Sequence, residues 1–345
     1  PPGAGWRRLH RGLVARAGAG RSADAAAAAF LRGFSVGDRT AATYAANWAS
    51  FSRYCMRRGR CALPANTNTV VNFVGWQWRR GSVKAASLKP MLAAVRKAHL
   101  AAGYANPCDD TRVREAKAGF RRADLQFRPS CERVRAPLPA RLAWTLARRA
   151  LDAPAARRRR LTALVCQFWW MRRSSDVARL AVGEVEARLD GSTHYVVPRH
   201  KTEAARGLLA RSLPPPRPED ARPDGEPDLP HFLLQRLLGD LAHLPVSARL
   251  FKTCRAQVAA KLFSAWLLEE LRLMGIVAPV GTSYAPHSLK GGGATAANAA
   301  GVPRGAIAEL SATTERTLAA SYISALAPPT DYDRFFFGRM LPPSV

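Results

Sequence analysis

The sequence is poor in acidic residues and has no long hydrophobic run. No apolar stretch reaches the roughly 18 residues that a membrane-spanning helix requires, so we expect no integral membrane protein. Only 25 acidic residues stand against 53 lysines and arginines, which gives a net charge of +28 at pH 7. Folding does not require such an excess. It therefore indicates a polyanionic partner, with nucleic acid considered before an acidic membrane surface.

Cysteine and histidine patterns typical of disulfide or metal sites are also missing. The six cysteines form no CxxC pair and show no regular spacing. We interpret them as reduced, structural residues of an intracellular protein. His194 and His200 share one face of an expected strand, but two ligands without a third make a poor metal site. Gly291–Gly293 lacks the surrounding G-x-x-x-x-G-K-[ST] pattern of a nucleotide-binding P-loop. We therefore expect no metal and no cofactor.

Composition and periodicity divide the 345 residues into five segments. Residues 1–34 form a basic arm that we expect to be disordered, although an organelle-targeting peptide shares its composition. The chain begins without methionine, so we expect a fragment or a processed product. Residues 35–126 show amphipathic helical periods and predict a compact helical domain. Three prolines in residues 127–139 mark a linker at 127–137, before a second domain at 138–326 and a tail at 327–345.

The front of the chain is its more strongly cationic part. Residues 1–135 carry 25 cationic and 7 acidic residues, against 28 and 18 in the remainder. Helices are expected at 40–58, 67–78, 87–102 and 110–122. Six cations cluster around the third of these helices and its approach: Arg79, Arg80, Lys84, Lys89, Arg96 and Lys97. They predict a track for the phosphates of duplex DNA, and a solvated helix face is the alternative for any one of them.

The second domain mixes helices with a small sheet. Helices are expected at 138–151, 161–171, 231–243, 255–275, 287–300, 303–310 and 315–323, and strands at 185–190, 193–198 and 207–213. The helix at 161–171 is apolar nearly all round, which predicts that it is buried. The fold class is therefore predicted as α+β and mostly helical, with a small antiparallel sheet.

Four short patterns in this domain carry candidate chemistry. Arg173 follows the buried helix, and Lys201 ends the second strand of an expected hairpin. His287 and Lys290 lie one helical turn apart, so both can face a single group. Tyr322 lies 32 residues after Lys290. Each pattern alone also has an ordinary structural explanation. The arginine could form an ion pair, and the tyrosine could be a half-buried side chain whose hydroxyl is solvated.

Taken together, in this order and spacing, the patterns resemble the catalytic domain of the tyrosine recombinase (phage integrase) family. Arg173-Ser-Ser-Asp-Val-Ala-Arg-Leu180 is similar to the family's R-x-S-E-L-x-x-L pattern. His287-Ser-Leu-Lys290, followed by small residues, resembles its H-x-L-R box, and Ser321-Tyr322-Ile323 its nucleophile box. The HSL-x-GG-ATAA form is most similar to recombinases of eukaryotic mobile elements (DIRS-like and Crypton-like). The resemblance covers roughly residues 35–325, and its helical part resembles the family's core-binding, SAM-like DNA-clamp domain.

The resemblance implies a site-specific recombinase or integrase that cleaves and rejoins duplex DNA through a 3′-phosphotyrosine intermediate. Tyr322 would be the nucleophile and Lys201 the general acid, and Arg173, His287 and Lys290 would bind the scissile phosphate. Fixed cations stabilise the negative charge that gathers in such a transition state. A tyrosine hydroxyl with a pKa near 10 needs this cationic setting before it attacks.

The same resemblance carries expectations about partners and location. Double-stranded DNA would be the partner, bound by a dimer to tetramer of the chain, without a membrane, a small-molecule substrate, a metal or a nucleotide. The protein would lie in the nucleus of a eukaryote, or otherwise with the nucleoid in the cytoplasm.

Two positions depart from the family's pattern. Lys290 replaces an arginine, which keeps the charge but loses the planar fork. Thr313, nine residues before Tyr322, stands where the family has histidine or tryptophan. Losing one phosphate-clamping donor costs about two to three decades of rate in comparable sites. The alternative is therefore a catalytically decayed or domesticated DNA-binding protein on the same fold. A general RNA-binding protein is a third hypothesis, and no RRM-like signature supports it.

Two further segments leave alternatives open. The run Arg157–Arg160 precedes the buried helix and contacts either phosphate or solvent. Phe335-Phe336-Phe337 in the tail forms an apolar patch, which either docks on a neighbouring protomer or packs on its own domain.

Overall fold

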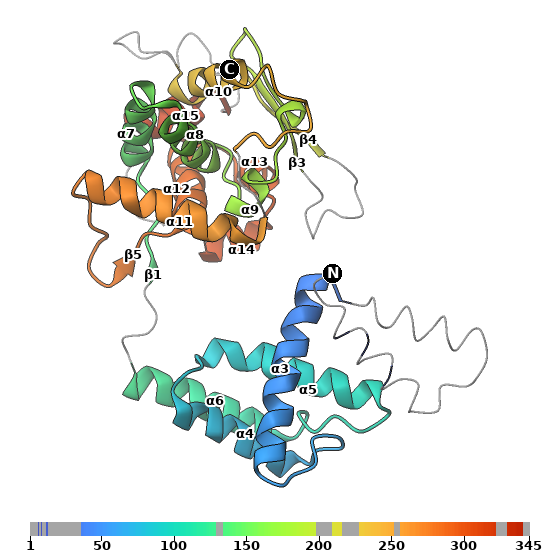
Figure 1. The fold of residues 1–345 in the computed structure, drawn as a ribbon. Coiled ribbons are helices and arrows are strands. Elements are labelled where there is room, and N and C mark those ends of the chain that lie inside the picture. Colours follow the sequence, from blue (N-terminus) through green and yellow to red (C-terminus); the bar gives the residue numbers. More distant parts are fainter. Residues whose placement is uncertain are drawn as a thin grey trace. The chain divides into compact units, whose positions relative to one another are not determined.

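The computed structural model describes residues 36–128, 134–197, 209–215, 228–251, 256–321 and 330–340, together with Trp6, Arg8 and Gly12. The chain forms two compact units, Pro1–Glu132 and Arg133–Val345 (Figure 1). The boundary between them lies within residues 127–137.

Helices are the regular elements of the first unit within its described residues. Its helices are α3 (Asp38–Arg57), α4 (Thr67–Arg80), α5 (Ala85–Ala101) and α6 (Thr111–Phe127). The expected helices at 40–58, 67–78, 87–102 and 110–122 are thus confirmed, with ends shifted by a few residues, because side chains outside the apolar stripes set the ends. Asn66 caps α4 by accepting from the Thr69 amide, and Asp110 caps α6 by accepting from the Arg112 amide.

Aromatic side chains fill the core of this unit. The ring of Phe73 on α4 lies 5.2 Å from that of Phe51 on α3 and 5.4 Å from that of Tyr54. His99 on α5 is fully buried, and its Nε2 accepts a 2.8 Å hydrogen bond from the Ala65 amide. Burial lowers the pKa of His99, so it is a neutral core residue that fixes the loop before α4.

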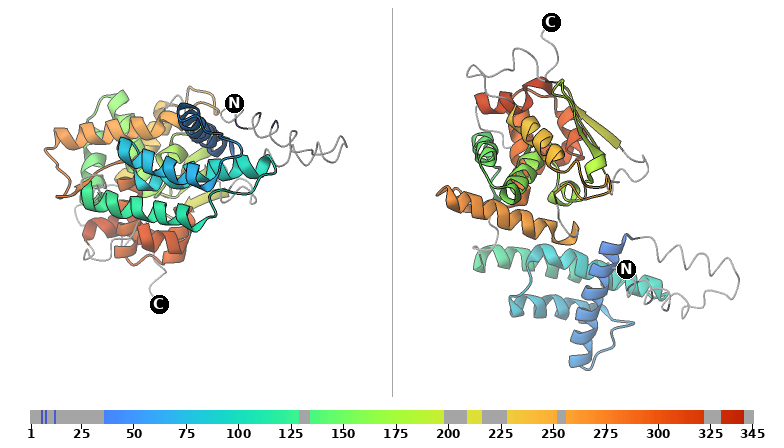
Figure 2. Two further views of the ribbon diagram at one scale, coloured as in Figure 1. Left: turned by 90° about the horizontal axis from the view of Figure 1, so that it is seen from below. Right: turned by 45° about the horizontal axis from the view of Figure 1, so that its top comes forward.

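The second unit surrounds a buried helix with other helices and places a small sheet at one side (Figures 1 and 2). The long helices are α7 (Ala140–Leu151), α8 (Ala155–Trp169), α10 (Leu229–Asp240), α11 (Ala256–Leu273) and α12 (Pro286–Ala299). Shorter helical segments are α9 (Ser174–Val177), η2 (Val182–Glu184), α13 (Arg304–Leu310), α14 (Glu315–Ser321), α15 (Asp331–Phe337) and η4 (Gly338–Met340). Helices were expected for all the longer segments before residue 323.

The sheet is antiparallel, in the order β2-β3-β4. Its strands are β2 (Val185–Ala187), β3 (Thr193–Val197) and β4 (Leu209–Leu213), and Tyr195 at the centre faces Val185 and Arg211. The expected third strand is therefore present. A separate parallel pair joins β1 (Val134–Arg135) to β5 (Thr282–Ser283) and brings residues 134–138 beside the start of α12. Together these elements give the α+β, mostly helical fold that the sequence predicts.

The helix α8 begins at Ala155, six residues earlier than expected, and the arginine run lies inside it. Arg157 pairs with Glu270 at 2.7 Å, Arg158 pairs with Asp240 at 2.8 Å, and Arg159 donates to the Leu250 carbonyl at 2.8 Å. These three arginines therefore tie α8 to neighbouring segments of its own unit. Arg160 is exposed, as the solvent alternative expects, and contact of the run with phosphate stays a prediction.

Two glycines let α12 approach α8 closely. A Cβ atom on Gly293 would collide with the Phe168 carbonyl oxygen, and one on Gly292 would collide with the Leu138 carbonyl oxygen. These positions require glycine for packing, and the contacts fix the middle of α12 against α8 and against Leu138, which precedes α7.

The aromatic tail packs on its own unit. The Phe336 and Phe337 side chains are buried, and the Phe336 ring lies 4.9 Å from Phe168 and 5.7 Å from Trp144. The hypothesis of an apolar patch free to dock on a neighbouring protomer is wrong for these two residues, because the surface of α7, α8 and α12 covers them.

Candidate functional site

The first candidate residue, Arg173, lies where α8 ends and α9 begins. The buried helix stops at Trp169, and Met171 takes a left-handed conformation with φ of 51°. This turn reverses the chain, so that Arg173 is the N-terminal cap residue of α9 and is half-buried. The apolar helix thus holds the arginine at a fixed point of the unit.

The start of α12 places the second pair of candidates. Pro286 occupies the first turn, and its carbonyl accepts a 2.8 Å hydrogen bond from the Gln167 side chain of α8. His287 and Lys290 follow three residues apart, as expected for one helix face. His287 is half-buried, whereas Lys290 is fully buried.

Lys290 contacts the other position that departs from the family's pattern. Its Nζ donates 2.7 Å hydrogen bonds to the Thr313 hydroxyl and to the Ser311 carbonyl oxygen. Both acceptors lie in the turn after α13, where Ala312 has a φ of 46°. The two departures therefore form one hydrogen-bonded unit, which the sequence did not indicate.

The charges of these residues act on one another. Burial, together with the positive charge of Arg173, lowers the pKa of Lys290 to about 7, and the carboxylate of Asp176 opposes the shift. Burial also lowers the pKa of His287, with the positive charge of Arg135 as the next cause. Lys290 and Arg173 add to this effect. The structure thus brings Arg173, His287, Lys290 and Thr313 together from separate segments of the unit.

The other two predicted catalytic residues, Lys201 and Tyr322, lie outside the residues that the structure describes. The strand before Lys201 is described to Val197, and the helix before Tyr322 to Ser321. Their roles remain predictions.

Three residues of this site were not singled out from the sequence. The positive charge of Arg135 on β1 lowers the pKa of His287. Only the pairing of β1 with β5 places Arg135 in this part of the unit. The negative charge of Asp176 on α9 opposes the lowering of the pKa of both His287 and Lys290. Its Oδ2 is buried without a hydrogen-bond partner in the described part of the chain. Arg172 is buried, and its positive charge lowers the pKa of Lys290. A signal existed for Arg172 and Asp176, since both lie beside Arg173 in sequence.

Among the described residues, no group of three histidine, cysteine or acidic side chains could hold a metal ion. Cys55, Cys61, Cys108 and Cys166 are free. Within the same described ranges, no helix is long and apolar enough to cross a membrane.

The predicted DNA-binding cations of the first unit lie on α4, on α5 and between them. Arg79 and Arg80 occupy the last turn of α4, and Lys84 is the N-terminal cap residue of α5. The guanidinium of Arg80 lies 4.6 Å from the centre of the Trp76 ring. Lys89 and Arg96 are exposed on α5, whereas Lys97 is half-buried. The structure thus gathers the six cations on adjoining segments, and their contact with DNA remains a prediction.

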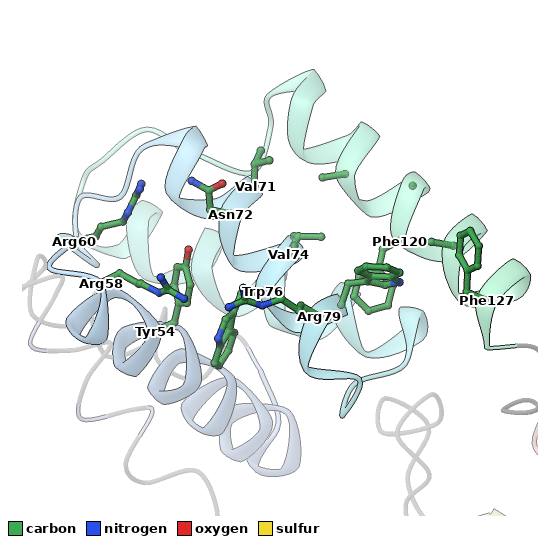
Figure 3. A pocket seen from close by; sticks show the side chains of 15 residues that line it. Tyr54, Arg58, Arg60, Val71, Asn72, Val74, Trp76, Arg79, Phe120 and Phe127 are labelled. Carbon is green, nitrogen blue, oxygen red and sulfur yellow. The ribbon is translucent and has the colours of Figure 1, made fainter.

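A groove of about 650 Å³ lies beside one end of this track, between α4, α6 and the end of α3. Figure 3 shows Tyr54, Trp76 and Phe127 in its wall, with Arg58, Arg60 and Arg79 among them. No acidic side chain is among the described lining residues. The groove extends the positive surface of the unit beyond the six predicted cations.

Comparison with known proteins adds to this geometry. No family model matches the sequence. The chain is 33% identical over 96 residues to the integrase/recombinase xerD homolog of Selenomonas ruminantium, a match covering 27% of this chain and 28% of the relative. The chain therefore spans little more than a quarter of that relative's length.

Solved structures resemble the fold over most of the chain. A lambda integrase dimer bound to a COC′ core site has a TM-score of 0.54 at 17% identity, covering 85% of this chain and 91% of that one. The Tn1549 transposon integrase in complex with transposon right end DNA has a TM-score of 0.59 at 12% identity, covering 92% and 95%. The chain therefore has a fold similar to that of these integrases, and a quarter of its sequence resembles a recombinase homolog.

Proposed function

We propose that the chain is a site-specific DNA recombinase of the integrase type, which binds duplex DNA and cleaves and rejoins its strands through Tyr322. The observation that carries this proposal is the convergence of Arg173, His287 and Lys290 in one part of a tyrosine recombinase fold. The named neighbours, lambda integrase and the Tn1549 integrase, are bound to DNA.

The convergent cations suit a phosphodiester. Its oxygens repel an incoming nucleophile, and the transition state gathers further negative charge that fixed cations stabilise. Arg173 offers a planar fork for two oxygens. With its pKa lowered, His287 is neutral at neutral pH, so one ring nitrogen donates to an oxygen and the other is free to accept a proton.

In the proposed reaction the Tyr322 oxygen attacks the scissile phosphorus. The Tyr322 hydroxyl gives its proton to the neutral ring of His287, a phosphorus–tyrosine bond forms while the bond from phosphorus to the 5′ oxygen breaks, and Lys201 gives that oxygen a proton. The 3′-phosphotyrosyl link keeps the bond energy, so a 5′ hydroxyl can reverse the step and rejoin a strand. No metal or nucleotide takes part.

The first unit would hold the duplex through the track of six cations. Because the lambda integrase neighbour is a dimer on its DNA, we extend the proposal to a homo-oligomer of this chain on DNA. An origin in a mobile element and a nuclear location belong to the same proposal.

A second candidate is a DNA-binding protein that has lost cleavage. It is favoured by the position of Lys290, whose ammonium already donates to Ser311 and Thr313. An ammonium used in this way has less capacity to bind a phosphate than an arginine would have.

Trapping the covalent intermediate separates the two candidates. Nicked duplexes, from a random pool or from candidate element ends, are incubated with wild type, Tyr322→Phe and the double variant Lys290→Arg/Thr313→His. The last two positions are changed together because they contact each other. The readout is a protein–DNA band that resists SDS and is removed by protease.

We expect a band with wild type that disappears with Tyr322→Phe. A band only with the double variant would identify a decayed enzyme. No band with any protein, on DNA that the protein binds, would refute the catalytic proposal.

A further inference from the structure

Arg172 carries a buried guanidinium whose nitrogens lack a geometrically defined hydrogen bond to the described residues. The residue is 1% exposed, and none of its three side-chain nitrogens is hydrogen-bonded in the part of the chain that the structure describes. Buried polar groups are normally paired, and an unpaired buried charge is strongly unfavourable. A buried guanidinium of this kind suggests that a ligand supplies the missing hydrogen-bond acceptors.

The turn after α8 sets the position of this side chain. The Arg172 amide donates to the Gln167 carbonyl at 3.2 Å, which fixes the backbone just before Arg173. The guanidinium carbon lies 6.0 Å from the centre of the Tyr195 ring on β3. That distance is the outer limit of a cation–π contact. Two consecutive arginines therefore extend from one turn.

The surroundings of Arg172 carry excess positive charge. Its charge lowers the pKa of Lys290, as that of Arg173 does. Arg172 also opposes the rise that burial causes in the pKa of Tyr195. Among the described residues, Asp176 is the carboxylate that acts on Lys290. Three cations with one carboxylate, largely out of water, make a site that favours an anion.

We propose that Arg172 is a second guanidinium for the anion that Arg173 binds, and that this anion is a phosphate group. Identifying it as the scissile phosphate of DNA rests on the proposed function. Arg172 would supply the planar fork that position 290 lacks, since the Lys290 ammonium already contacts Ser311 and Thr313.

The first test uses inorganic phosphate, so it needs neither a DNA site nor cleavage. Thermal unfolding of the full chain is measured with and without millimolar phosphate, at ionic strength matched with chloride. The proteins are wild type, Arg172→Met and Arg172→Lys, with Arg272→Met as the control. Arg272 is exposed in the last turn of α11, so its variant loses the same charge from the surface of the same unit.

We expect phosphate to raise the melting temperature of wild type and of the control by a few degrees, and that of Arg172→Met by far less. Without phosphate, Arg172→Met should melt no lower than wild type, because an apolar side chain replaces an unpaired buried charge. That result also shows that the variant folds. Arg172→Lys, which keeps the charge without the fork, should give an intermediate phosphate response.

The second test is the covalent trapping assay on nicked duplex. Arg172→Met should lower the yield by about tenfold or more, while Arg272→Met leaves it unchanged. A phosphate response that is absent in wild type or kept by Arg172→Met would overturn the inference. A response that depends on Arg172, without any covalent complex, would support the anion site and refute the recombinase activity alone.

Discussion

The Nζ of Lys290 lies 2.7 Å from the hydroxyl oxygen of Thr313. These are the two positions at which the chain departs from the pattern of tyrosine recombinases. Because the two side chains are hydrogen-bonded to each other, the two departures are structurally linked. A lysine fits where the shorter threonine leaves room for its ammonium and offers it an acceptor. Changing either residue alone disturbs this contact.

The first prediction concerns this pair. Thr313→Ala removes one of the two acceptors of a buried ammonium and should lower the free energy of unfolding by about 1–3 kcal/mol. Thr313→Ser keeps the hydroxyl and is the matched control. Urea unfolding measures the change, and a double-mutant cycle with Lys290→Met should show a coupling of about 0.5–3 kcal/mol. Strictly additive effects would show that the contact does not stabilise the protein.

Lys290 should also make stability depend on pH. Its pKa is about 7 in the folded chain and 10.5 in the reference state, so between these values the unfolded chain binds more protons. Stability should therefore rise with pH across this window, by up to about 1.4 kcal/mol per pH unit, and level off below about pH 7. The difference between wild type and Lys290→Met, measured by urea unfolding at several pH values, isolates this effect. Parallel curves for the two proteins would contradict it.

Packing at Gly293 gives a prediction independent of charge. Gly293→Ala would place a Cβ against the Phe168 carbonyl and should cost about 1–3 kcal/mol of unfolding free energy or more. Gly239→Ala in α10 is the control, because nothing lies within 4 Å of the position where its Cβ would be. That variant should gain roughly 0.5–1 kcal/mol. Thermal unfolding of both variants decides the matter, and equal destabilisation of the two would be inconsistent with the close approach of α12 to α8.

The cation track of the first unit predicts how DNA affinity responds to salt. Removing one phosphate-binding cation, as in Lys89→Ala or Arg96→Ala, should reduce the slope of log affinity against log salt by about 0.9. Arg112→Ala is the control, because Arg112 is paired with Asp110 at 2.9 Å. Fluorescence anisotropy with a short duplex at several salt concentrations gives the slopes. A change for Arg112→Ala equal to that of the track variants would indicate a general effect of net charge.

Local patterns in the sequence predicted most of the elements. The apolar stripes located α3 to α6, and the Asp190-Gly191 turn located the β2–β3 hairpin, because periodicity and turn chemistry act over a few residues. The sequence predicts the start of α8 too late, because four of the helix's first six residues are arginines. Their partners, Glu270 and Asp240, lie about a hundred residues away in sequence and leave no local trace.

The sequence by itself determined the charge of the protein, its two-part organisation, the helices and the order of Arg173, His287 and Lys290. These features depend on composition and on spacing within one helix or turn. Only the tertiary structure decided that Lys290 contacts Thr313, that Arg172 is buried beside Tyr195, and that Phe336 packs on its own unit. Such contacts arise when segments far apart in sequence pack together, and no local pattern encodes which side chains will meet.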